Sequence, residues 1–89
     1  MAAHAHSKSV AARLARVAGH EQAVRRMVLE GRPCADVLVQ MAAVRGAMDR
    51  AAKVLLADHM EHCVLDSSRG RNPRKNLAEL RKALERFMG

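Results

Sequence analysis

The feature that most constrains the fold is a heptad pattern that begins at Cys34. Apolar side chains then follow at alternating steps of three and four residues, through Val37, Met41, Val44, Met48, Ala51 and Leu55. This spacing lines them along one side of a helix and is typical of a packing seam. Pro33 suits the first position of a helix, and no strong breaker follows until Ser67–Gly70, although Gly46 is a weak point. The pattern predicts a helix of about 30 residues, which is long enough to need a partner alongside.

Two shorter helices are expected on either side. Ser7–Glu30 carries an apolar stripe, and Gly31 suits the left-handed position that ends a helix. A third helix would follow Gly70–Pro73, with Asn72 as its cap and Pro73 as its first residue. The stripes consist of Val10, Leu14, Val17, Val24 and Val28 in the first helix, and Leu77, Leu80, Leu84 and Phe87 in the third. We expect an all-α fold with three helices, the first two forming an antiparallel hairpin.

The chain length favours one domain that is supported by oligomerisation. With 89 residues and two cysteines, a monomer has a modest core and no disulfide framework. We expect residues 1–6 to be a flexible tail and residues 7–89 to be a single helical domain. We expect no signal peptide, and the apolar runs are too short to span a bilayer, so we expect a cytoplasmic protein without a membrane partner. No nucleophile–base pair or phosphate loop is present, so an enzyme is not expected.

The charge balance indicates a polyanionic partner. Lys and Arg number 16 against 9 Asp and Glu, which gives a formal charge of +7. With one aromatic residue, base stacking of single strands is disfavoured and duplex DNA fits better. No helix-turn-helix is evident, so we expect contacts to phosphates and DNA shape. The basic residues that fall mainly outside the apolar stripes and would bind DNA are Lys8, Arg13, Arg16, Arg45 and Arg50, with Arg25, Arg26 and Lys53 nearby.

A metal site is predicted from three residues of the long helix. His59 and Cys63 are four residues apart and share one helix face. Cys34 lies 25 residues upstream, about 37 Å along the same helix, so one ion cannot bind all three within one chain. If two copies cross antiparallel near Gly46 and Ala47, however, Cys34 of one copy meets His59 and Cys63 of the other. Two equivalent sites then form in a twofold dimer.

The ligand types restrict the metal. Two thiolates and one imidazole suit Cu(I) in trigonal geometry, whereas Zn(II) and Ni(II) usually require a fourth donor. His62, or His4 and His6 from the tail, would supply one, so Ni(II) or Co(II) is the alternative. Cys34 also lies in the first turn of its helix, where a thiolate is stabilised. A reactive-thiol sensor of formaldehyde or sulfane sulfur is therefore a rival interpretation. Two further alternatives are that the cysteines only fill a packed seam, and that the chain is a basic helical protein that binds membranes or DNA nonspecifically.

Four stretches of the sequence carry a family resemblance. Arg13–His20, Gly31–Cys34, Gln40–Arg45 and Asp58–Val64 resemble the copper-sensing operon repressor family, which also includes nickel/cobalt and formaldehyde sensors. The resemblance covers about residues 7–87. A cysteine followed 25 residues later by His-x3-Cys is typical of the copper branch. The chain departs from that branch at Pro33, where tyrosine is usual, and its tail histidines resemble nickel-type members.

The resemblance implies a mechanism and further site residues. It implies an antiparallel four-helix-bundle dimer, a dimer-of-dimers tetramer, and metal bound between protomers. The apo-protein would repress a metal-efflux operon, and metal would release it from operator DNA. Arg13 and Arg50 fall at positions of DNA-contacting arginines. Glu79 falls where copper-type members carry a carboxylate that couples the third helix to the metal site.

Overall fold

The computed structural model describes the backbone of residues 7–68 and 74–89, and the side chains of residues 7–61 and 77–89. Three helices make up these ranges, which confirms the all-α prediction: α1 (Ser7–Leu29), α2 (Cys34–Ser68) and α3 (Arg74–Met88). They fall into two compact units, an N-terminal unit ending at Asp58 and a C-terminal unit beginning at His59. The predicted tail 1–6 and the cap Asn72–Pro73 lie outside the described residues.

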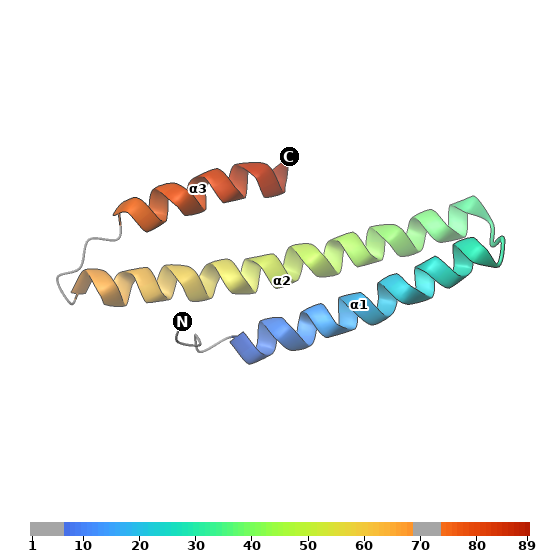
Figure 1. The fold of residues 1–89 in the computed structure, drawn as a ribbon, viewed down its shortest axis with the longest axis horizontal. Coiled ribbons are helices and arrows are strands. Elements are labelled where there is room, and N and C mark those ends of the chain that lie inside the picture. Colours follow the sequence, from blue (N-terminus) through green and yellow to red (C-terminus); the bar gives the residue numbers. More distant parts are fainter. Residues whose placement is uncertain (1–6, 69–73) are drawn as a thin grey trace. The chain divides into compact units, whose positions relative to one another are not determined.

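In the N-terminal unit, α1 and the first part of α2 run antiparallel, side by side (Figure 1). Val10, Val17 and Val24 of α1 are buried, as are Val37 and Ala51 of α2. Residues seven apart lie on the same side of a helix, so each helix buries one row against the other. His20 Nε2 donates a hydrogen bond to Gln40 Oε1 across the hairpin, at 2.8 Å. The predicted hairpin is therefore present, and it is held by a narrow row of small side chains.

The turn between α1 and α2 is a Schellman motif. Gly31 has φ 71°, in the left-handed region that favours glycine. The Gly31 N–H donates to the Val28 carbonyl at 3.1 Å, and the Arg32 N–H donates to Met27 at 3.0 Å. These two bonds satisfy carbonyls that the end of a helix leaves free. The predicted role of Gly31 is confirmed.

The start of α2 differs by one residue from the prediction. The Val37 N–H donates to the Pro33 carbonyl at 3.1 Å, so Pro33 stands just before the helix and Cys34 is its first residue. The helix then continues through Gly46 without a break. A methyl group on Gly46 would meet only Arg50 Nη1, at an ordinary 3.5 Å. Gly46 therefore weakens the helix only through its own flexibility.

The predicted seam of α2 consists of two neighbouring rows that differ in burial within this chain. The inner row, Val37, Val44 and Ala51, faces the hairpin, with Val37 and Ala51 exposed by only 8% and 2%. The outer row, Cys34, Met41, Met48 and Leu55, is exposed, and its last three members are exposed by 51%, 39% and 52%. Each row repeats every seven residues, so the alternating three- and four-residue steps in the sequence contain both rows and do not distinguish them. Within this one chain, α1 covers the inner row and leaves the outer row exposed.

In the C-terminal unit, α3 turns back and runs antiparallel to the end of α2 (Figure 1). Leu80 and Leu84 are half-buried, whereas Leu77 and Phe87 are exposed by 37% and 49%. No helix in the described part of the chain is long and apolar enough to cross a membrane.

Candidate metal centre and DNA-binding surface

The three predicted metal ligands all lie on α2. Cys34 is its first residue and has an exposed, free thiol. His59 lies in the C-terminal unit and is partly buried. Cys63 belongs to the same helix one turn further on, but its side chain and that of His62 lie outside the described residues. His4 and His6 lie outside them as well.

The clearest sign of a ligand is an unsatisfied nitrogen on His59. Its Nε2 is buried, and no group among the described residues forms a hydrogen bond with it. A buried polar atom without a partner is costly and calls for an explanation. Neutral imidazole is a common metal ligand through this nitrogen. The donor types of Cys34 and His59 fit a soft metal ion.

Among the side chains that the structure describes, no three His, Cys, Asp or Glu residues of this one chain are close enough to hold a metal ion. Cys34 and His59 are 25 residues apart on α2, which corresponds to about 37 Å along a helix.

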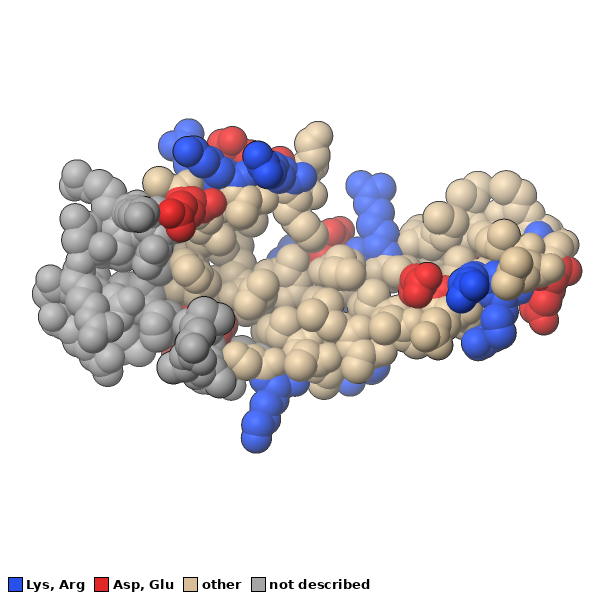
Figure 2. Space-filling view, viewed as in Figure 1, with Lys and Arg blue, Asp and Glu red and all other residues tan. Residues whose placement is uncertain are grey.

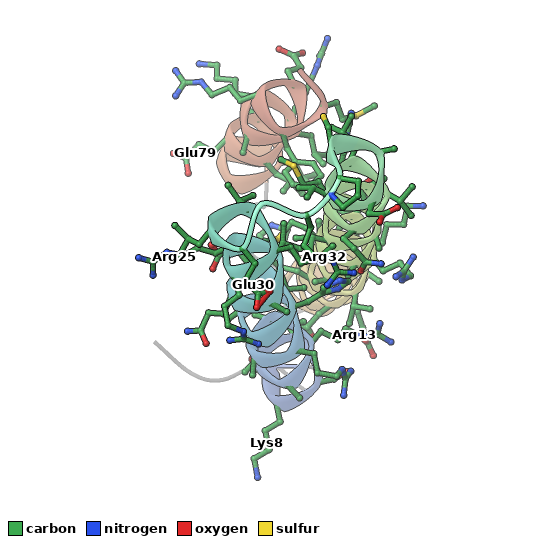
Figure 3. The ribbon with its side chains drawn as sticks, turned by 90° about the vertical axis from the view of Figure 1, so that its right-hand side faces the viewer. Lys8, Arg13, Arg25, Glu30, Arg32 and Glu79 are labelled. Atoms are coloured by element: carbon green, nitrogen blue, oxygen red, sulfur yellow. The ribbon has the colours of Figure 1, made fainter. Side chains whose placement is uncertain are left out.

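The basic residues predicted to bind DNA do not share one environment. Lys8, Arg16, Arg45 and Arg50 are exposed, whereas Arg13 is partly buried and its Nε has no hydrogen-bond partner among the residues that the structure describes. Figure 3 shows Lys8 pointing away from the start of α1, with Arg13 and Arg25 on different sides of that helix. In Figure 2, basic side chains border a broad uncharged surface of the hairpin rather than cover it.

Two polar features were not assigned a role from the sequence. His20 forms a hydrogen bond to Gln40 across the hairpin. Asp58 is exposed by only 4% and has an interaction partner of its own. A signal for Asp58 was present, since it follows Ala51 by seven residues and so continues the inner row.

Glu79, predicted to couple α3 to the metal site, is exposed and points away from its helix (Figure 3).

Comparison with known proteins identifies the class. Residues 6–86 match the sequence family described as metal-sensitive transcriptional repressor. The copper-sensing transcriptional repressor CsoR of Bacillus subtilis (strain 168) is 37% identical over 75 residues, covering 84% of this chain and 74% of the relative. The copper-sensing transcriptional repressor RicR of Mycobacterium tuberculosis (strain H37Rv) is 41% identical over 66 residues, covering 71% and 69%.

Two solved structures are also similar. The nickel-responsive transcriptional regulator InrS has 44% identity and a TM-score of 0.77, with 98% of both chains covered. A copper-sensing operon regulator protein, CsoRGz, has 57% identity and a TM-score of 0.59, covering 63% of this chain and 93% of that one. The fold and the matches define a DNA-binding repressor rather than an enzyme. This chain belongs to the CsoR-like family of metal-sensitive transcriptional repressors.

Proposed function

We propose that this repressor senses a soft metal ion held between two copies of the chain. Cys34 of one copy and His59 and Cys63 of the other are the ligands. The observation that carries the proposal is the buried, unpartnered Nε2 of His59. In addition, Cys34 and His59 cannot meet within one straight helix. The family sets the role of metal as the signal.

The outer row of α2 supports an antiparallel dimer. Met41, Met48 and Leu55 expose apolar surface at seven-residue intervals, in line with Cys34. A partner helix on this row would bury it, and α1 of each copy would complete a four-helix bundle. Two such dimers would form the tetramer. Residues 7–89 then act as one assembling domain, with residues 1–6 as a tail.

We favour Cu(I) as the inducing metal. Two thiolates and one imidazole form a trigonal set that suits Cu(I) without a further donor. Ni(II) or Co(II) would need more nitrogen ligands, which His62, His4 or His6 could supply. CsoR and RicR are named as copper-sensing, and InrS as nickel-responsive. Copper-sensing and nickel-responsive relatives are thus both similar to this chain. Our preference for Cu(I) rests on the proposed ligands, two thiolates and one imidazole.

Operator DNA is bound by the apo-protein and released when metal binds. Lys8, Arg13, Arg16 and Arg50 would contact phosphates. Metal at the ends of α2 would draw in α3 through Glu79 and change the spacing of these cations. A coupling of about 1–3 kcal/mol is typical of such switches. The released operon would encode metal efflux, and the repressor would act in the cytoplasm.

Anaerobic titration of the reduced apo-protein with Cu(I) and Ni(II), followed by DNA binding, tests the proposal. We expect one tight Cu(I) per chain, a loss of DNA affinity of about 5–150-fold, and neither effect in Cys34→Ala or His59→Gln. His20→Gln is the matched control, since it removes an imidazole that already has a hydrogen-bond partner. If His20→Gln abolished metal binding as His59→Gln does, or if metal left DNA affinity unchanged, the proposal would be wrong.

A thiol-reactive sensor is the second candidate, favoured by the exposed free thiol of Cys34. In that case an aldehyde or sulfane sulfur donor, rather than metal, would release DNA. Mass spectrometry after chelation separates the two functions. A covalent adduct on Cys34 that tracks DNA release favours the thiol sensor, and release that is reversed by a chelator favours metal.

A further inference from the structure

A second row of α2 residues runs beside the outer row at the same interval. Leu38, Arg45 and Ala52 are seven residues apart, and each falls between members of the outer row in alternating steps of four and three. Leu38 is exposed by 57%, Arg45 is exposed and Ala52 is half-buried. The two rows together form the two-residue stripe that packs between paired helices. The same spacing, continued along α2, reaches His59.

This stripe pairs with itself when two copies run antiparallel. Its members are arranged symmetrically about the point between Gly46 and Ala47. Crossing there places Cys34 level with His59 of the second copy, Leu38 with Leu55, Met41 with Ala52 and Arg45 with Met48. Each large side chain at Met41 then faces a small one at Ala52. The register that brings the proposed metal ligands together is therefore also the register that matches the stripe.

Arg45 is the one charged residue in the stripe between Leu38 and Leu55. Asp49, one turn further on, borders the same stripe and is also exposed. Within the described side chains, neither residue forms an ion pair in the single chain, although they are four residues apart. An arginine buried in an apolar interface is costly unless an opposite charge meets it. Asp49 of the second copy would lie about one residue's rise, roughly 1.5 Å along the axis, from the level of Arg45.

We propose that Arg45 of each copy pairs with Asp49 of the other, and that these two reciprocal ion pairs set the register of the dimer. The inference rests on the antiparallel dimer of the proposed function. Twofold symmetry places both pairs on the same side of the interface, close to its centre. A shift of α2 by one turn would separate each Arg45 from its Asp49 and misalign Cys34 with His59. Arg45 is thus a positioning residue for the metal site and not a DNA contact.

Mixing two charge-reversal variants tests this inference. Arg45→Asp alone places two carboxylates opposite each other, and Asp49→Arg alone places two guanidinium groups opposite each other. Each variant should dimerise at least about tenfold more weakly than wild type. A mixture of the two restores opposite charges across both contacts, so heterodimers should dominate by native mass spectrometry. Within each variant chain, positions 45 and 49 carry the same charge. Dimerisation that recovers on mixing must therefore come from the contact between chains.

Lys53→Glu provides the matched control, because Lys53 is exposed on α2 away from the stripe. It should leave the dimer dissociation constant within about threefold of wild type. Random mixing of Arg45→Asp with Asp49→Arg, or equal weakening by Lys53→Glu, would overturn the inference. Metal titration distinguishes this failure from that of the proposed function. If the variants mix randomly but the wild-type protein responds normally to Cu(I), only the proposed register contact is rejected. If heterodimers are preferred but the wild-type protein binds no metal, only the proposed metal-sensing function is rejected.

Discussion

Gly31 occupies the turn of the hairpin in a conformation that other residues rarely adopt. Its φ of 71° and the two Schellman hydrogen bonds end α1 and direct the chain into α2. Gly31→Ala should destabilise the N-terminal unit by about 1–2 kcal/mol, because a Cβ is strained in this region. Urea unfolding followed by circular dichroism measures the change.

Gly19→Ala is the control of opposite sign. Gly19 lies within α1, and a Cβ there would meet nothing within 4 Å. This substitution should stabilise the chain by about 0.5–1 kcal/mol. If Gly31→Ala and Gly19→Ala destabilised the chain equally, the loss in Gly31→Ala could not be attributed to the backbone conformation at Gly31.

The His20–Gln40 hydrogen bond is a specific polar link between α1 and α2. We expect His20→Ala and Gln40→Ala each to cost about 0.5–1.5 kcal/mol of unfolding free energy. Because the two side chains act together, the double variant should cost clearly less than the sum. A double-mutant cycle by urea unfolding measures the coupling, and strict additivity would mean that the bond does not form in solution.

At the scale of the helices, the hairpin depends on valines at seven-residue intervals. Val17 lies in the middle of the buried row of α1, with 6% of its surface exposed. Val17→Ala removes buried apolar atoms and should cost about 1–3 kcal/mol. Leu29, exposed by 75% on the same helix, is the control, and Leu29→Ala should change the unfolding midpoint little. Comparable losses in both variants would contradict the burial pattern.

The helices could be predicted from the sequence because the residues that begin and end a helix act locally. Gly31 and the valine spacing of α1 indicated the turn and the inner face. The division of α2 into inner and outer rows could not be predicted, since Val37 and Met41 satisfy one 3-4 pattern equally well. Only the position of α1 decides which of them is buried. The spacing of Cys34 and His59 implied that one chain cannot close the site, but the unpartnered Nε2 of His59 depends on its surroundings.

For the whole molecule, the charge of +7 per chain should make DNA affinity strongly dependent on salt. The logarithm of the affinity should fall linearly with the logarithm of salt concentration. Arg16→Ala should reduce the slope by about one for each copy of Arg16 that touches a phosphate. Fluorescence anisotropy between 50 and 200 mM salt, the range over which about 10³–10⁵-fold losses are typical, measures it. An unchanged slope would remove Arg16 from the DNA surface.

The small inner core has a consequence for how the chain reaches its fold. The hydrophobic residues buried in the described part are four valines and one alanine, Val10, Val17, Val24, Val37 and Ala51. Such a core leaves little free energy to hold a lone hairpin against its conformational entropy. If the outer row is covered by a second copy, association supplies the rest, and folding becomes a bimolecular reaction. The refolding rate and the unfolding midpoint should then rise with protein concentration. A newly made chain would thus become a stable repressor only after it meets another copy, so its abundance would control how much of it is folded.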